Sequence, residues 1–434
     1  MSPRGSEQGT GRFSSRFPLP ASRFFLRVWA VDVFVARQPI FDVKQEVYGY
    51  ELLYRSGEQN SYTGVDGDEA SLAVIRNFLL VIGTERISGG SKAFVNFTKN
   101  LLLRGMATLL PVATGVVEIL EDVEPTPELV EMLKLLRSRG YTLALDDFIL
   151  RGNENNPFLD LVDIVKVDFK LAGVEEREEI AKKFLEKGKV RLLAEKTETR
   201  EEVDQAIELG YTLFQGYFFC KPVIISRKDI PGYKINYLRI LKELGAEDLD
   251  YKSLEEIISH DPALAFKLLK YINSAHFGQK RQVASIKRAL GILGEKEIKK
   301  WASLAVVMEF GKDQPLELLR LSLLRARLCE MLADILGCSE DGSSFFLMGL
   351  FSLMDVLLGR PMEEILGDIP IQAAPKAALL GKPNEHKDIF DLVVSYEKAH
   401  WEAILESTSR LKIDVSEIAR NYVDALKWVD GAFL

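Results

Sequence analysis

Seven short apolar runs in the first half of the chain each end on a side chain that can bind a cation or form a hydrogen bond. These side chains are Glu51, Asn96, Glu118, Asp146 with Asp147 beside it, Asp168, Glu195 and Gln215. The first four positions supply three carboxylates and one amide oxygen, an all-oxygen set that suits Mg²⁺ or Mn²⁺. Asp147 could hold a second ion, and two ions about 4 Å apart can activate a water and stabilise the leaving oxygen of a phosphodiester.

Basic side chains lie close to these acids in the sequence. Lys166 could orient or deprotonate a water, and deprotonation would need burial to lower the pKa of its ammonium. Arg55 offers a fork for a phosphate, and Glu195, Glu198 and Gln215 could hold waters or the edge of a base. Each residue alone is more often an exposed or salt-bridged side chain, and an internal ion-pair network is the alternative. Seven such strand ends in a row favour a binding site.

The runs themselves indicate the fold. Short apolar segments between turn signals are typical of strands buried on both faces of a parallel sheet. Helical patterns separate them at residues 69–81, 127–138, 175–186 and 200–209; Thr126 before Pro127 predicts a capped start, and Thr199 with Glu202 resembles a capping box. Successive βα units predict an α/β fold, a (β/α) TIM-type barrel over residues 33–222 with its site on the carboxyl face. Since such barrels typically need ~250 residues, some helices should be short or missing.

After residues 230–232 the pattern changes to helical periodicity, which predicts a second, all-α domain. Its expected helices are residues 253–258, 262–274, 286–293, 295–310, 315–336, 344–358, 388–405 and 415–428. We therefore expect a barrel domain at residues 32–230 and an all-α domain at residues 231–434, packed closely because no long low-complexity linker separates them.

The pair His260-Asp261 could suggest a metal site in the second half. Asp261 before Pro262 has instead the form of a helix N-cap. The chain has four histidines, and none completes a plausible second ligand pair. A structural role is therefore favoured.

Composition excludes some classes of function. The chain has 434 residues and a formal net charge of −8, which disfavours nucleic-acid binding by charge alone. No apolar run approaches the ~18 residues of a membrane span. The three cysteines, Cys220, Cys329 and Cys338, have no metal-ligand spacing and suit a reducing cytoplasm. Residues 1–31 read as a disordered tail or as a start assigned too early.

The motifs around the strand ends carry a resemblance. They read Glu51-Leu-Leu-Tyr-Arg55, Phe94-Val-Asn96, Glu118-Ile-Leu-Glu121, Asp146-Asp147-Phe, Lys166-Val-Asp168, Glu195-Lys-Thr-Glu198 and Gln215-Gly-Tyr-Phe-Phe-Cys-Lys-Pro222. In order and spacing this series resembles EAL domains, phosphodiesterases that linearise the bacterial messenger cyclic di-GMP with Mg²⁺ or Mn²⁺. The resemblance implies that Glu51, Asn96, Glu118 and Asp146 are metal ligands, with Asp147 at a second metal. It also implies that Lys166 and Glu195 serve the catalytic water, that Arg55 and Gln215 contact the dinucleotide, and that Glu198 and Asp168 have supporting roles.

The chain departs from the EAL pattern at two places. Residues 149–156 replace a glycine-rich loop, and Lys196 stands where the family has glycine after the glutamate. A segment that begins Ile149-Leu-Arg is not expected to approach the metals as a glycine-rich loop can. Two functions therefore stay open: a cyclic di-GMP phosphodiesterase, or a non-catalytic receptor or scaffold.

The second half resembles a different module. Residues 257–278, with His260-Asp261-Pro262 and Asn273, and residues 286–301, ending at Trp301, are similar to HDOD domains. These are all-α, HD-like domains that have lost the metal ligands and act in signalling or protein interaction. Together the two halves resemble fused EAL–HDOD bacterial signalling proteins. The resemblance implies a cytoplasmic protein with an unidentified protein partner at the HDOD half, and a homodimer is an expectation from other EAL barrels.

Overall fold

The structure is a computed structural model that describes residues 33–56, 90–150, 155–220, 235–244, 249–274, 282–368 and 371–432. Asp32–Leu434 form one compact unit. The tail predicted at residues 1–31 and the helix predicted at residues 69–81 lie outside the described residues.

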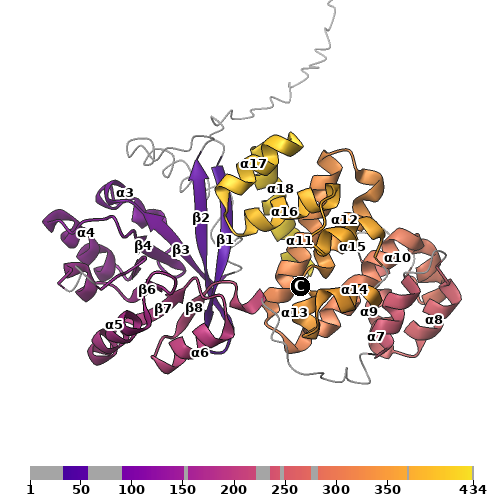
Figure 1. Ribbon diagram of the computed structural model, residues 1–434, viewed down its shortest axis with the longest axis horizontal. Helices are drawn as coiled ribbons and strands as arrows, with labels where there is room; N and C mark the ends of the chain where they lie inside the picture. Colours follow the sequence, from indigo (N-terminus) through magenta and orange to yellow (C-terminus); the bar gives the residue numbers. More distant parts are fainter. Residues whose placement is uncertain are drawn as a thin grey trace, which may run out of the picture. The chain divides into compact units, whose positions relative to one another are not determined.

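Eight strands form a closed barrel in the order β1 to β8 (Figure 1). They are β1 (Val33–Asp42), β2 (Val47–Ser56), β3 (Lys92–Phe97), β4 (Gly115–Ile119), β5 (Thr142–Leu145), β6 (Ile164–Asp168), β7 (Arg191–Glu195) and β8 (Leu213–Gln215). The pairs from β2 to β8 are parallel. The predicted (β/α) barrel is therefore confirmed for seven of its strands.

The first strand differs from the prediction. β1 runs antiparallel to both β2 and β8, and a tight turn joins it to β2. The Asp42 carboxylate stabilises this turn by accepting hydrogen bonds from the amides of Lys44 and Glu46. A uniform series of βα units does not describe this end of the barrel, and Glu51 lies within β2 and not at its end.

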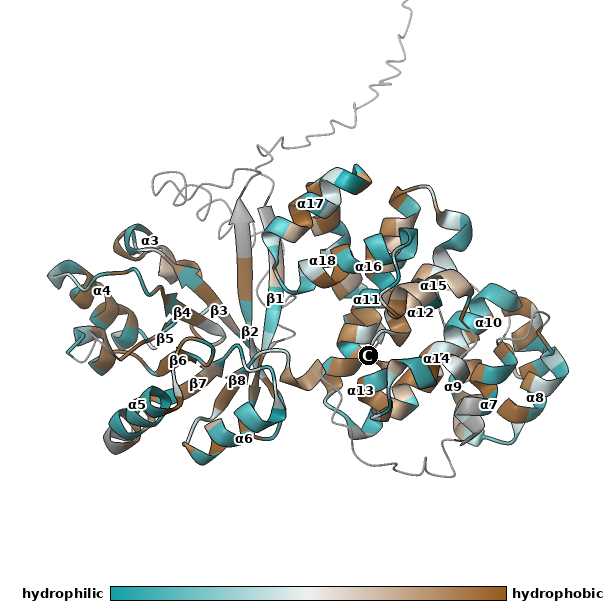
Figure 2. Cartoon of the chain, viewed as in Figure 1, coloured by the Kyte–Doolittle hydropathy of each residue, from teal (hydrophilic) through white to brown (hydrophobic). Residues whose placement is uncertain are grey.

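Helices cover the outside of the parallel strands, among them α3 (Lys99–Leu103), α4 (Pro127–Ser138), α5 (Val174–Lys187) and α6 (Arg200–Glu208). The Thr126 hydroxyl caps α4, and Thr199 with Glu202 forms the predicted capping box of α6. Figure 2 shows α6 as largely hydrophilic with a few hydrophobic positions. Its buried residues are Val203 and Ala206. α3 has only five residues, which agrees with the expectation of short helices.

The second half of the chain is helical, as predicted. Its helices are α7 (Ile235–Leu244), α8 (Tyr251–Ser259), α9 (Pro262–Ile272), α10 (Ile286–Phe310), α11 (Leu316–Ile335), α12 (Gly342–Phe351), α13 (Met354–Leu358), α14 (Met362–Asp368), α15 (Ala373–Leu379), α16 (Glu385–Glu397), α17 (Trp401–Leu411) and α18 (Val415–Ala432). Gly294 is non-helical with φ 70° and ψ 170°, so α10 consists of two helices, as the sequence predicted.

Two predicted helices are wrong in extent. Residues 344–358 form α12 and α13, separated at Ser352 and Leu353. Residues 388–405 are divided between α16 and α17. Ala399, between the two helices, has a positive φ of 52°, which is not helical. A continuous apolar period does not reveal these breaks, since both flanking helices bury their apolar side chains in the same core.

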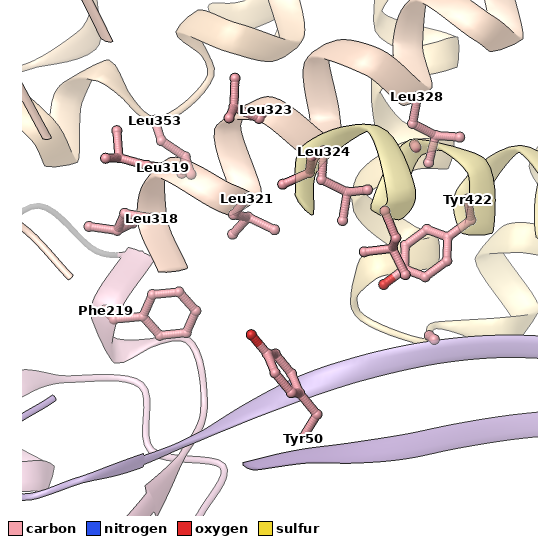
Figure 3. Packing of buried hydrophobic residues seen from close by; sticks show 14 of the residues in the cluster. Tyr50, Phe219, Leu318, Leu319, Leu321, Leu323, Leu324, Leu328, Leu353 and Tyr422 are labelled. Atoms are coloured by element: carbon pink, nitrogen blue, oxygen red, sulfur yellow. The ribbon is translucent and has the colours of Figure 1, made fainter. Parts of the chain in front are cut away.

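Barrel and helices pack against each other through β1, β2 and the segment η4 (Phe218–Cys220). The Tyr50 hydroxyl donates a hydrogen bond of 2.8 Å to the buried Glu317 carboxylate at the start of α11. Figure 3 shows Tyr50 and Phe219 beside the leucines of this helix. The expected close packing of the two halves is therefore present. No helix among the described residues has the length and apolarity needed to cross a membrane.

Candidate metal centre

The barrel interior explains why the polar residues meet. One apolar layer takes a residue from each of seven strands, namely Ile40, Phe94, Val116, Ala144, Ile164, Leu193 and Leu213. Alternate residues of a strand point to the same side, so the next inward position lies two residues further along each parallel strand. Those positions are Asn96, Glu118, Asp146, Lys166, Glu195 and Gln215. The antiparallel β1 contributes Gln38, two residues before Ile40, and β2 contributes Glu51, paired with Gln38.

Lys166 is the centre of this polar layer. Its side chain is 0% exposed, and its ammonium lies 2.7 Å from Asp146 Oδ1, 2.7 Å from Glu195 Oε1 and 3.4 Å from Glu51 Oε2. It also forms an ion pair with Glu118. The sequence therefore predicted correctly that these residues converge, and the structure brings together five of them from five strands.

The predicted lowering of the Lys166 pKa is wrong for this arrangement. Burial by itself would lower the pKa, but the surrounding carboxylates, of which Asp146 and Glu118 act most strongly, raise the pKa of Lys166 well above its ordinary value. The side chain is therefore an ammonium ion. It can donate hydrogen bonds and neutralise charge, whereas removing a proton from water is not a role for a charged lysine.

The charge balance fits a divalent cation. Four carboxyl groups surround one ammonium in a buried layer, which gives an excess of three negative charges when all four are ionised. Burial raises the pKa of Glu118 and of Glu195 well above the ordinary range. The Oε2 atoms of both side chains are buried and have no hydrogen-bond partner among the described residues. Oxygen atoms in this state suit a hard cation such as Mg²⁺ or Mn²⁺.

Two groups of acids could each hold an ion. Glu51, Glu118 and Asp146 form the first, and Asp146, Asp147 and Glu195 form the second, with the ligand atoms of each group within 4.8 Å of one another. Asn96 lies beside the first group and donates a hydrogen bond of 3.2 Å to Glu51 Oε1. The two groups share Asp146, which could therefore serve either ion.

The Gln215 side-chain amide links Glu51 to Gln38. Gln215 Nε2 donates to Glu51 Oε2 at 2.6 Å and to Gln38 Oε1 at 3.1 Å. Gln215 thus contacts a proposed metal ligand, in addition to any contact with a nucleotide. Sequence reasoning missed Gln38, because recognising it requires knowing that β1 is antiparallel and that its inward position lies before the apolar residue.

Asp147, Asp168 and Lys196 form a second cluster at the rim. The Lys196 ammonium lies 3.3 Å from both carboxylate oxygens of Asp147 and pairs with Asp168 Oδ2. Burial opposes ionisation of Asp168, but the hydrogen bond from Lys196 and the amide of Lys170 lower the pKa of Asp168. Sequence reasoning noted Lys196 only as a lost glycine and did not anticipate its contacts.

The loop after β7 is bound closely to the end of β8. Gly216 has φ 151°, and a Cβ atom there would lie 2.0 Å from the carbonyl oxygen of Thr197, so only glycine fits. The Thr197 amide and hydroxyl both donate to the Gln215 carbonyl at 3.1 Å. Glu198 follows in this loop and forms an ion pair with Lys170 of the preceding loop, which ties neighbouring strand ends together.

Some predicted features are not placed by the structure. Arg55 lies in β2, and its side chain is outside the described residues, as are residues 151–154 of the altered loop. The start of that loop is described. Phe148 packs edge-on against Phe184 of α5, and the Leu150 amide donates to Glu176. The chain therefore turns from the metal rim towards α5 directly after Asp147.

The His260-Asp261 pair is structural, as predicted. The Asp261 carboxylate caps α9 by accepting from the amides of Ala263 and Leu264, and the exposed His260 ring bonds the Glu256 carbonyl. The three cysteines carry free thiols.

Comparisons with known proteins agree with both halves of this description. The EAL domain family matches residues 91–222, and the HDOD domain family matches residues 230–360. The chain is 38% identical over 403 residues to the uncharacterized protein YuxH of Bacillus subtilis, an alignment that covers 91% of this chain and 98% of YuxH. It is 34% identical over 397 residues to the cyclic di-GMP phosphodiesterase CdgJ of Vibrio cholerae, covering 91% of this chain and 92% of CdgJ.

Among solved structures, a standalone EAL protein of Vibrio cholerae O395 in its c-di-GMP bound form is 24% identical, with a TM-score of 0.34, and the match covers 44% of this chain and 92% of that chain. The two full-length relatives and the order of the two domain matches lead to one conclusion: the chain belongs to the family of proteins in which an EAL domain is followed by an HDOD domain.

Proposed function

We propose that the barrel hydrolyses cyclic di-GMP to linear pGpG with the help of two divalent ions, Mg²⁺ or Mn²⁺. The observation that carries this proposal is the convergence of Glu51, Glu118, Asp146 and Glu195 on Lys166 in one buried layer. The relative CdgJ, named as a cyclic di-GMP phosphodiesterase, supports the choice of substrate.

In this proposal each residue has a defined role. Glu51, Asn96, Glu118 and Asp146 would hold the first ion, and Asp147, with Asp146, would hold the second. When bound, such ions lower the pKa of a water and stabilise the leaving oxygen. The Lys166 ammonium orients the attacking water and balances the carboxylates, while the buried Oε2 of Glu195 accepts a hydrogen bond from that water.

The remaining residues position the substrate and the rim. Arg55 and Gln215 contact the dinucleotide, with Gln215 also fixing Glu51. Glu198 supports the loop after β7 through its ion pair with Lys170. Asp168 supports the next loop, since its carboxylate accepts hydrogen bonds from the amides of Lys170 and Leu171.

A second function is a non-catalytic receptor for cyclic di-GMP or a scaffold. The observation that favours it is the ion pair of Lys196 with Asp147, because a cation already faces the carboxylate proposed for the second ion. A receptor would bind the dinucleotide in the same barrel without cleaving it.

One experiment separates these functions. The full chain is incubated with cyclic di-GMP and Mn²⁺ or Mg²⁺, and the product is analysed by chromatography while binding is measured by calorimetry. The phosphodiesterase forms linear pGpG, and Glu51→Gln and Lys166→Met abolish it. Binding without product supports the receptor, and neither binding nor product leaves the scaffold.

We also propose the domain limits 32–230 and 231–434, a cytoplasmic location and a regulatory or partner-docking role for the helical domain. The extension of the helical domain beyond the HDOD match is supported by contacts of its later helices. Arg325 of α11 forms a buried bidentate pair with Glu397 of α16, at 2.7 and 2.9 Å. Arg320 pairs with Asp430 of α18 at 3.2 Å. A homodimer is kept as a prediction, to be tested by light scattering.

A further inference from the structure

Lys196 occupies an unusual place beside the proposed second ion. Its ammonium lies 3.3 Å from both Asp147 oxygens and pairs with Asp168, a side chain that is 4% exposed. Asp147 is one of the three acids in the group Asp146, Asp147 and Glu195. A positive charge carried by the chain itself therefore sits against the ligand set of the outer ion.

The backbone indicates that this placement is built into the loop. Lys196 has φ 54° and Asp147 has φ 38°, both in the left-handed region that non-glycine residues rarely adopt. Such conformations are unfavourable for residues with a side chain and persist where surrounding contacts hold them. The hydrogen bonds of Thr197 to the end of β8 fix the loop directly after Lys196. Asp147 is fixed in turn, because the amide of its neighbour Phe148 donates a hydrogen bond to the Lys166 carbonyl.

The two candidate ion positions differ in the ammonium groups that face them. The inner group, Glu51, Glu118 and Asp146, is buried around Lys166, whose four carboxylate neighbours leave an excess of negative charge. In the outer group, Asp147 is already paired with Lys196. Lys166 faces acids of both groups, but only the outer group faces a second ammonium, that of Lys196. An ion at the outer position must therefore displace or repel Lys196 as well, whereas an ion at the inner position need not.

We propose that Lys196 is a tethered cation that competes with the outer divalent ion, so that the chain binds one ion tightly and the second weakly. This inference rests on the proposed metal centre, and Lys196 is the residue that would set the number of ions bound there. Lys196 is a positioning residue here, because it acts on substrate only through Asp147. Exchange between the ammonium and the second ion would switch the barrel between a one-ion and a two-ion state.

The test is the number of Mn²⁺ ions bound per chain, measured without nucleotide by equilibrium dialysis with elemental analysis and by electron paramagnetic resonance. The full-length protein is compared with Lys196→Met, which removes the charge, and Lys196→Gly, which also suits the left-handed backbone. The matched control is Lys134→Met, because Lys134 is a half-exposed lysine of α4 that pairs with Glu131 of the same helix.

We expect one tightly bound Mn²⁺ in the wild type and in Lys134→Met. Both Lys196 variants should bind a second ion at least about tenfold more tightly, as expected for removing one like charge at a partly exposed site. Spin coupling between two neighbouring Mn²⁺ ions should appear in these variants at lower metal concentration. Circular dichroism of each variant checks that the fold is retained.

The outcomes distinguish this proposal from the proposed function. Two ions of equal affinity in the wild type and in the Lys196 variants would overturn the role of Lys196 and leave the two-ion phosphodiesterase standing. An equal gain in Lys134→Met would also overturn it, since a general charge effect would then explain the result. No bound Mn²⁺ in any variant would overturn both.

Discussion

The Gln215 side-chain amide donates a hydrogen bond of 2.6 Å to Glu51 Oε2, which joins the last strand of the barrel to the first proposed metal ligand. Both side chains are buried, with exposed fractions of 4% and 6%. Groups that fix a ligand carboxylate from behind determine its orientation and affect metal affinity.

Gln215→Leu should therefore weaken binding of the inner Mn²⁺ about tenfold, because Glu51 loses the donor that orients it. Calorimetric titration with Mn²⁺ in the absence of nucleotide measures this directly. Gln205→Leu on the outer helix α6 serves as the control and should bind Mn²⁺ as the wild type does. Unchanged affinity in Gln215→Leu would show that the contacts of Glu51 with Asn96 and Lys166 hold it sufficiently.

Lys166→Met should destabilise the protein by about 3 kcal/mol in the presence of a chelator, because four carboxylates would face one another in a buried layer without a countercharge. Urea unfolding followed by circular dichroism gives the free energy of unfolding. Saturating Mn²⁺ should recover part of the loss, since a cation then replaces the missing charge. A variant as stable as the wild type in chelator would contradict the view that the ammonium holds this layer together.

Tyr50→Phe tests the contact between barrel and helices. It removes the hydroxyl that bonds the buried Glu317 carboxylate and should lower the free energy of unfolding by about 1–3 kcal/mol. Tyr251→Phe, at an exposed position of α8, should change it by no more than about 0.5 kcal/mol. Equal effects of the two substitutions would mean that the contact contributes nothing specific.

His386 should give the stability a pH dependence. Its ring stacks on Phe345 with centroids 4.0 Å apart, and burial lowers the pKa of His386 although Asp341 lies 3.0 Å away. Since the folded state resists protonation, the unfolded state binds more protons below its ordinary value of about 6.5. The contribution of His386 is therefore full above that pH and falls as the pH drops from there towards the lowered pKa of the folded state.

This dependence is checked by urea unfolding at pH 7.5, 6.5 and 5.5 for the wild type and for His386→Gln. The loss of stability between pH 7.5 and 5.5 should be smaller in the variant than in the wild type. The exposed His260 provides the control, and His260→Gln should follow the wild type at each pH. A variant His386→Gln with the full wild-type slope would assign the pH dependence to other groups.

Most of the polar layer could be predicted from the sequence because each parallel strand repeats one pattern, an apolar residue followed two positions later by a polar one. This pattern does not identify the inward polar residues of β1 and β2. Glu51 lies inside a long strand, and Gln38 precedes its apolar partner, since β1 runs in the opposite direction. The turn between β1 and β2 contains no Asn-Gly or similar pair. Asp42 alone indicates it in the sequence.

The contacts of Lys196 could not be predicted in the same way. Spacing identifies which residues share a rim, but the direction of a long, flexible side chain depends on the backbone conformation of its loop. Lys196 reaches Asp147 and Asp168 from a left-handed residue, which only the folded chain reveals. Similarly, the break at Ala399 depends on one backbone angle inside an otherwise continuous apolar period.

The antiparallel β1 strand has a consequence for how this chain can be divided. No βα crossover follows β1, and α16 and α18 of the helical half pack on it instead. Tyr50, paired with this strand, is 2% exposed and lies beside α11, where Glu317 accepts its hydrogen bond. A fragment ending at residue 230 would expose the surface of β1 and β2 that the helical half covers, and we expect it to self-associate or unfold. The barrel should therefore be expressed together with the helical half, as one chain.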